Sequence, residues 1–150
     1  MKRLKPPLTP CLIAAWTIAA VSLPFSPPAA AESGPVATVR SFVDAFNARD
    51  LDGMAALVTD DVEWLSVDGR DVGTETEGKA ALRSTMEEYF RSCPSCRSEL
   101  GQVVATGDRV AAVETARWEG KDGPSSQRSL SVYELRDGRI RRVYYYPAKK

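Results

Sequence analysis

Four runs of residues after Cys96 alternate between apolar and polar side chains, and this pattern limits the possible folds more than any other feature of the sequence. The runs are "RSELGQVVATG", "DRVAAVETARWEG", "QRSLSVYELR" and "RIRRVYYYP", separated by "GD", "KDGPSS" and "DG". Alternation indicates β-strands with one buried face, and glycine-rich connections of this length are typical of turns. We therefore expect a meander of four long antiparallel strands.

Three helices and one further strand are expected before the meander. The stretch "PVATVRSFVDAFNARD" has helical spacing with Pro35 at the first position, and Asp50 is placed to cap a short second helix through "LDGMAALV". A third helix should begin at Thr76 or Gly78 and run through "GKAALRSTMEEYFR". Between the second and third helices, "DVEWLSV" alternates like a strand, and "DGRDVGTETEG" suits a loop or a short edge hairpin. This order predicts an α+β domain with three helices packed on one face of a curved sheet.

The first 31 residues have the features of a secretory signal peptide. A basic start, "MKRLK", precedes the apolar "CLIAAWTIAAVSLPF" and the small residues of "SPPAAAES", so cleavage is expected after Ala31. The alternative is an uncleaved membrane anchor, but the apolar run is shorter than the ~20 residues a spanning helix needs. It also contains Pro24. We expect residues 32–150 to form one secreted or periplasmic domain with no membrane attachment after cleavage.

The charge balance and the absence of histidine exclude several classes of function. Lys2, Arg3 and Lys5 leave with the leader, so 20 basic residues become 17 against 20 acidic ones, a net charge of −3. Nucleic-acid binders instead concentrate Lys and Arg on one face, so no nucleic-acid partner is expected. The chain contains no histidine, which is the commonest general base and metal ligand. We expect neither a metal nor another cofactor.

The "SCPSC" motif holds the two cysteines that remain after processing, Cys93 and Cys96. A zinc site would need two further ligands of a kind the chain lacks. A redox CxxC pair usually sits at a helix N-terminus, whereas this pair follows a helical run and so lies at its electronegative end. Disulfides persist in exported proteins. A structural disulfide that closes the turn between helix and strand is therefore favoured over a redox pair.

Two segments resemble the NTF2-like cone, and within it the SnoaL-like and ketosteroid-isomerase-like branch. They are "FVDAFNARDLDGMAALVTDDVEW" at 42–64 and the closing hairpin "YELRDGRIRRVYYY" at 133–146. The resemblance covers nearly all of residues 32–150. It implies three helices on a curved, mixed, mainly antiparallel sheet with a cavity at its open end. The fold carries isomerases, cyclases, dehydratases, hydrolases and domains without chemistry, so it does not determine the function.

The resemblance also implies that the catalytic groups of ketosteroid isomerase are missing. It places the catalytic aspartate of that enzyme at Ser66, its oxyanion-hole tyrosine at Phe42 and its second oxyanion-hole acid at Ser131. A serine hydroxyl needs a neighbouring base to be activated, and phenylalanine has no proton to donate. Chemistry by that arrangement is therefore not expected.

Strand parity predicts which side chains around "DDVEWLSVDG" face the cone. Trp64 is too large and apolar to be left in water, so it should face inward together with Val62 and Ser66. Glu63 then points away from the pocket. The remaining acids, Asp60, Asp61 and Asp68, lie at the ends of this strand.

Glu114 is the one charged candidate for the inner face. It shares a strand face with Val110, Ala112, Ala116 and Trp118, and the resemblance turns that face toward the cavity. A carboxylic acid in an apolar pocket can act as a general acid or base. Two alternatives are an ion pair with a neighbouring arginine and a one-residue slip that turns Glu114 to solvent.

These observations leave three classes of function open. The first is a binding module for a small, largely apolar ligand. Its expected lining is Phe42, Phe46, Trp64, Trp118, Tyr133 and Tyr145, with Ser66, Ser131 and Glu114 as polar contacts. The second is an acid–base isomerase, dehydratase or cyclase that uses Glu114. The third is a purely structural dimerisation domain.

The reverse face of the meander is too apolar for open solvent. It carries Val113, Leu130, Val132, Tyr144 and Tyr146, with Arg117 and Arg142. Because NTF2-like proteins commonly pair through this face, the resemblance implies a homodimer. The alternative is a monomer with tyrosines scattered over its surface.

Overall fold

The computed structural model describes residues 34–148 and has the expected order of helices and strands. The elements are α1 (Pro35–Ala48), α2 (Leu51–Ala56), β1 (Val58–Asp68), β2 (Asp71–Glu77), α3 (Lys79–Ser92), β3 (Arg97–Thr106), β4 (Arg109–Gly120), β5 (Gly123–Arg136) and β6 (Arg139–Tyr146). The predicted signal peptide, residues 1–31, lies outside the described residues.

The helix boundaries follow from local capping. The carboxylate of Asp50 accepts a hydrogen bond from the Gly53 amide at 2.8 Å and so caps α2 as predicted. The third helix begins at Lys79, with Gly78 as its N-cap residue. Thr76, the other expected starting point, instead belongs to β2, where it pairs with Trp64 of β1. The polar stretch before α3 is therefore the edge hairpin rather than a loop.

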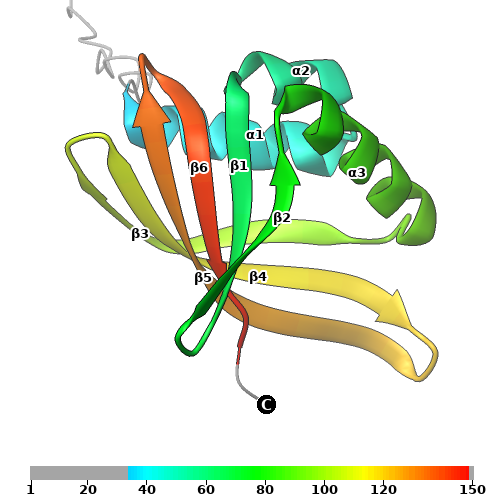
Figure 1. Cartoon of the computed structure of the whole chain (residues 1–150). Coiled ribbons are helices and arrows are strands. Elements are labelled where there is room, and N and C mark those ends of the chain that lie inside the picture. Colours follow the sequence, from blue (N-terminus) through cyan, green and yellow to red (C-terminus); the bar gives the residue numbers. More distant parts are fainter. Residues whose placement is uncertain (1–33, 149–150) are drawn as a thin grey trace, which may run out of the picture. The chain divides into compact units, whose positions relative to one another are not determined.

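The six strands form one sheet in the order β2-β1-β6-β5-β4-β3, in which only β1 and β6 run parallel. The sheet is thus mixed and mainly antiparallel, and with the three helices it gives the expected α+β class. Figure 1 shows the sheet curling, with the helices on one side and the hairpin between β4 and β5 lying away from them. The helices pack against the curled sheet, and the hydrophobic core lies between them.

The turn between β5 and β6 confirms the closing hairpin that the sequence predicted. Asp137 and Gly138 both have positive φ, 53° and 74°. This combination is required by the two-residue turn whose twist matches that of the paired strands, and Asp-Gly is a favoured sequence for it. The turn sets the pairing of Leu135 with Ile140, and a register shift between Glu134 and Leu135 then places Tyr133 opposite Val143 and Ser131 opposite Tyr145.

A hydrophobic core fills the space between the helices and the inner face of the sheet. Its buried members are Val39, Phe42, Met54, Val58, Val62, Leu82, Val110, Ala112, Tyr133, Leu135, Ile140 and Val143. One row of cross-strand partners, Val110, Tyr133, Val143 and Trp64, spans β4, β5, β6 and β1 on the inner face. Tyr133 is the largest fully buried side chain, with 1 % of its surface exposed.

A disulfide between Cys93 and Cys96 joins the end of α3 to the start of β3, with an S–S distance of 1.99 Å. Cys93 is the residue that terminates α3, and its backbone N–H still donates to Tyr89 of the last helical turn. The predicted clip between helix and strand is confirmed.

Candidate functional site

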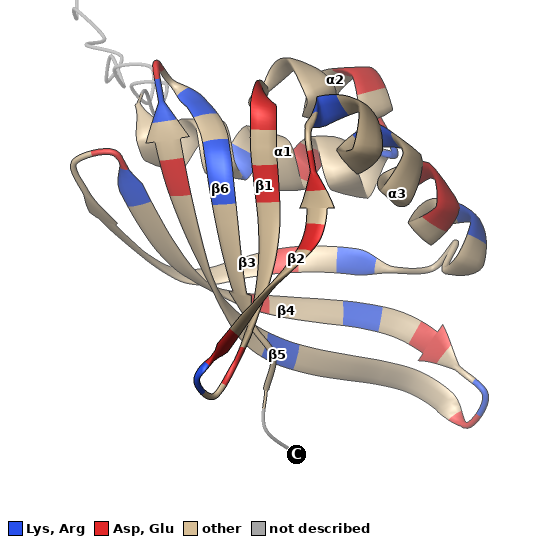
Figure 2. Ribbon diagram, viewed as in Figure 1, with Lys and Arg blue, Asp and Glu red and all other residues tan. Residues whose placement is uncertain are grey.

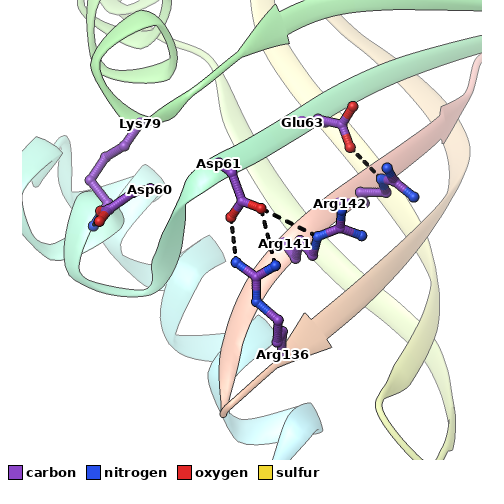
Figure 3. A network of polar contacts seen from close by, with 7 residues as sticks. All are labelled: Asp60, Asp61, Glu63, Lys79, Arg136, Arg141 and Arg142. Carbon is purple, nitrogen blue, oxygen red and sulfur yellow. Dashed lines mark hydrogen bonds and ion pairs between the residues drawn. The ribbon is translucent and has the colours of Figure 1, made fainter.

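Asp61 and Glu63 of β1 face the outside of the sheet, toward arginines of β5 and β6. Figure 2 shows acidic residues on β1 beside basic residues of β6. The network consists of Asp60, Asp61, Glu63, Lys79, Arg136, Arg141 and Arg142, which Figure 3 shows. Asp61 binds Arg136 at 2.5 Å and Arg141 at 3.5 Å, and Glu63 binds Arg142. The hydrogen bond from Arg136 holds the pKa of Asp61 well below its ordinary value. Asp61 and Glu63 are therefore engaged in ion pairs on the outer face of the sheet, whereas Asp60 pairs with Lys79 at the start of α3 at 2.8 Å.

Trp64 faces inward and packs against the edge of the hydrophobic core. Its ring centroid lies 6.3 Å from that of Phe42 on α1. Phe42 is 3 % exposed, whereas Trp64 is half-buried. The strand parity inferred from the sequence thus holds for β1, and Phe42 belongs to the core behind the tryptophan.

The next inner row carries three hydroxyl groups on three adjacent strands. Ser131 of β5 pairs with Tyr145 of β6, which pairs with Ser66 of β1. Ser131 is 1 % exposed, and its hydroxyl has no hydrogen-bond partner among the described residues. The hydroxyl lies close enough to the Tyr133 phenol to act on its ionisation, but the two do not meet hydrogen-bond geometry. A buried hydroxyl without a partner is unusual and destabilising.

Glu114 lies on the inner face of β4, opposite Ser129 and one row further out than Ser131. The Tyr133 hydroxyl donates a hydrogen bond to one carboxylate oxygen of Glu114, and the Ser98 hydroxyl donates to the other at 3.3 Å. Burial, followed by the charge of Glu114, raises the pKa of Tyr133 well above its ordinary value. Tyr133 therefore keeps its proton and acts as a donor. The partners of Glu114 are a phenol and a hydroxyl rather than the arginine considered as an alternative.

Phe46 and Trp118 lie apart from this polar group. Phe46 stacks against α3, with its ring centroid 5.2 Å from that of Phe90. Trp118 is at the far end of β4 and lines an open hollow of about 230 Å³. The other residues of this hollow are Ser95, Arg117, Glu119, Pro124, Ser125 and Ser126. The nine predicted lining residues thus fall into a core-edge group, an aromatic contact between helices and a hairpin hollow.

Sequence reasoning missed two residues that complete the polar group. Ser98 reaches Glu114 from β3, and Asn47 of α1 holds Ser98 by two hydrogen bonds to its backbone, at 2.8 and 2.9 Å. The register of β3 shifts between Leu100 and Val103, and this irregularity determines which β3 side chain lies near Glu114. A polar residue on the inward-facing end of an amphipathic helix, such as Asn47, was the available signal.

Within residues 34–148, no three His, Cys, Asp or Glu side chains are grouped so that they could hold a metal ion. No helix in this range is long and apolar enough to cross a membrane.

Comparisons with known proteins relate the chain to one domain family. A model described as the SnoaL-like domain matches residues 39–143. No curated protein matches the chain in sequence. An NTF2-like protein of unknown function from Burkholderia pseudomallei is 23% identical, with 78% of this chain and 92% of that one covered at a TM-score of 0.66. TerC, co-crystallised with polyporic acid, is 20% identical, with 77% and 92% covered at 0.66. AclR from Streptomyces galilaeus, a candidate hydroxylase, is 20% identical, with 74% and 76% covered at 0.60. At these identities the likeness establishes the NTF2-like fold.

Proposed function

Because the chain belongs to the SnoaL-like domain family, we propose that it is an exported protein that binds one small, largely apolar ligand at the open end of its cone. The proposed export, to the periplasm or the medium, rests on the features of residues 1–31. TerC, which has the same fold, was co-crystallised with polyporic acid, and this supports a ligand-binding role.

The observation that carries the proposal is the unsatisfied hydroxyl of Ser131 beside Glu114. A ligand oxygen that accepts from Ser131, and a ligand O–H or N–H that donates to Glu114, would complete this group. Half-buried apolar side chains packed against the core supply walls for the ligand body: Leu100 is the cross-strand partner of Glu114, and Trp64 lies in the row next to Ser131. An apolar wall with a few converging polar groups is the usual composition of a small-molecule site.

Acid–base catalysis by Glu114, as an isomerase, dehydratase or cyclase, is the second candidate, and the inward position of the carboxylate favours it. However, Tyr133 and Ser98 both donate to this carboxylate. Both carboxylate oxygens are thus already engaged by groups of the protein itself. The arrangement therefore supports binding over proton transfer. A purely structural role would not explain why a hydroxyl without a hydrogen-bond partner is buried at Ser131.

We expect native mass spectrometry of the protein purified from its exporting cell to detect a retained small molecule. Trp64→Ala should lose it, because the wall beside the polar group is removed. Glu114→Gln keeps the shape of the side chain and should change affinity by no more than about tenfold, the value of one hydrogen bond. Glu99→Gln, on the exposed side of β3, is the matched control.

Two results would contradict the binding proposal. The first is the absence of any retained molecule from wild type. The second is a substrate whose turnover disappears in Glu114→Gln while its binding and the fold are unchanged, which would establish the enzymatic alternative.

We also propose that a second copy of the chain pairs with the outer face of the sheet. Leu130 and Tyr146 are 43 % and 38 % exposed there, in line with the half-buried Val132 and Tyr144. A charged row borders this apolar strip: Arg109, Glu134, Arg142 and Glu63 are successive cross-strand partners. Their charges alternate in sign, so the row can meet its own copy with opposite charges in contact.

Leu130→Asp should convert such a dimer to a monomer in sedimentation velocity experiments. Each copy would bury an unpaired carboxylate, so the dimer dissociation constant should rise by about 100-fold or more. Gln102→Asp, on the exposed edge strand β3, should leave the dimer intact. A wild-type protein that sediments as a monomer at every concentration would refute the pairing.

A further inference from the structure

Arg49 ties the end of α1 to the turn that the disulfide closes. It terminates α1 in the left-handed conformation, with φ 62°, which is costly for a residue other than glycine. Its guanidinium donates to the carbonyl oxygens of Pro94 at 2.8 Å and Cys96 at 2.6 Å. The same group lies over the ring of Phe90, 4.5 Å from the centroid. These contacts hold the arginine against the turn and offset the cost of its backbone conformation.

The turn contacts four elements: α1, α3, β3 and β4. Cys93 terminates α3, and Cys96 directly precedes β3. The hydroxyl of Ser95, between them, accepts a hydrogen bond from the Glu119 amide of β4 at 3.0 Å. Arg49 supplies the contact with α1. A change in the turn therefore reaches β3 and β4 together.

The polar group at Glu114 begins two residues after the disulfide. Asn47, in the same last turn of α1 as Arg49, holds the backbone of Ser98 at both its N–H and its C=O. The Ser98 hydroxyl in turn donates to Glu114. One end of α1 thus fixes both the disulfide turn and the residue that orients Glu114.

The surroundings of Cys96 favour opening of the disulfide by an external thiol. Arg49 and Arg97 both donate to the Cys96 carbonyl, at 2.6 and 2.8 Å. Two positive charges therefore lie against the backbone of Cys96, and positive charge beside a cysteine favours its thiolate and counters the negative end of a helix. Cys96 is 5 % exposed, whereas Cys93 is half-buried. An incoming thiolate therefore reaches the Cys93 sulfur, and Cys96 leaves as the thiolate, the order that favours exchange.

We infer that the Cys93–Cys96 disulfide is a redox switch that sets the position of Ser98 against Glu114. A dithiol supplies two electrons and two protons. Its first thiolate attacks Cys93, the S–S bond breaks, and the mixed disulfide is resolved by the second thiol. The dithiol ends as a disulfide and the protein as two thiols. With the turn opened, only Asn47 and the pairing with β4 hold this part of β3 within residues 34–148, so the contact of Ser98 with Glu114 opens more often. The consequence for ligand binding rests on the function proposed above, whereas the switch itself does not.

The switch is tested without a ligand by amide hydrogen exchange and NMR on the oxidised protein and on the protein reduced with dithiothreitol. The entropy cost of closing a four-residue loop means that the disulfide lowers the equilibrium constant for local opening by roughly 20-fold. Exchange of the Ser98 amide should therefore accelerate by about that factor on reduction. The Glu114 carboxyl carbon should shift as its donor leaves. The amide of Val143, in the core row, is the control and should keep its protection.

The double variant Cys93→Ala with Cys96→Ala provides a second route to the open state and should reproduce the reduced spectrum without reductant. Equal protection of Ser98 in the oxidised and reduced forms would overturn the inference. So would a disulfide that resists excess dithiothreitol while the protein stays folded. If Ser98 responds but no ligand is ever found, the switch stands and the proposed binding function fails.

Discussion

Replacing Tyr133 by alanine is expected to lower the free energy of unfolding by about 3–5 kcal/mol, the usual cost of removing a buried aromatic ring. Tyr133 is 1 % exposed and lies between Val110 and Val143 in the inner row. Its loss leaves a cavity at the centre of the core and removes the donor to Glu114. Urea denaturation followed by circular dichroism measures the change. An unchanged slope of the unfolding free energy against urea concentration would show that the unfolding transition is otherwise the same.

Tyr133→Phe separates the hydroxyl from the ring and is expected to cost about 1–3 kcal/mol, because Glu114 keeps Ser98 as its partner. The substitution should also change how the free energy of unfolding depends on pH. The pKa of Tyr133 is raised by burial and by Glu114, so the folded state holds this proton more tightly than the unfolded state. The corresponding stability is present below the ordinary tyrosine pKa of about 10 and is lost as pH rises above it.

Tyr133→Phe should therefore show a shallower loss of stability in alkaline solution than the wild type. Tyr89, whose pKa burial also raises, accounts for part of the remaining decline, and Tyr89→Phe measures that part. If Tyr133→Phe declined as steeply as wild type above pH 10, the phenol of Tyr133 would not be the group that titrates.

Replacing Arg49 by alanine is expected to cost about 2–4 kcal/mol. The variant loses two charge-assisted hydrogen bonds to carbonyl oxygens and the contact with the Phe90 ring. Alanine retains the unfavourable left-handed conformation, so nothing offsets these losses. Thermal or urea unfolding under oxidising conditions measures the change.

Arg49→Gly is the matched control, because glycine adopts a positive φ without strain. It should be more stable than Arg49→Ala by about 1 kcal/mol and still less stable than the wild type. A glycine variant as stable as the wild type would show that the guanidinium contributes nothing and that the backbone conformation alone makes Arg49→Ala unstable.

The sequence predicted the fold because each element carried its own local signal. Alternation located the four strands after Cys96, and Asp137–Gly138 specified the turn that closes the last hairpin. The end of the polar stretch was less certain, because glycines and threonines suit both a loop and an edge strand. Pairing with β1, a contact distant in sequence, placed Thr76 in β2.

The candidate site was only partly predictable, because parity gives the face of a side chain but not its depth. Glu114 and Trp118 share a face of β4, yet four residues of strand separate them by about 13 Å. One residue therefore lies in the polar group and the other in the hairpin hollow. Ser98 was not foreseen because its place near Glu114 depends on the irregular pairing of β3.

The hold of Asn47 on Ser98 also bears on how the protein behaves in a crowded solution. β3 is an outer strand of the sheet, and its exposed Val104 lies on a row of backbone groups open to other chains. The amide of Asn47 occupies both backbone groups of Ser98, and the bulge after Leu100 interrupts the row again. Uninterrupted edges are the starting points of fibrils, so a single asparagine helps to keep neighbouring molecules from joining sheet to sheet.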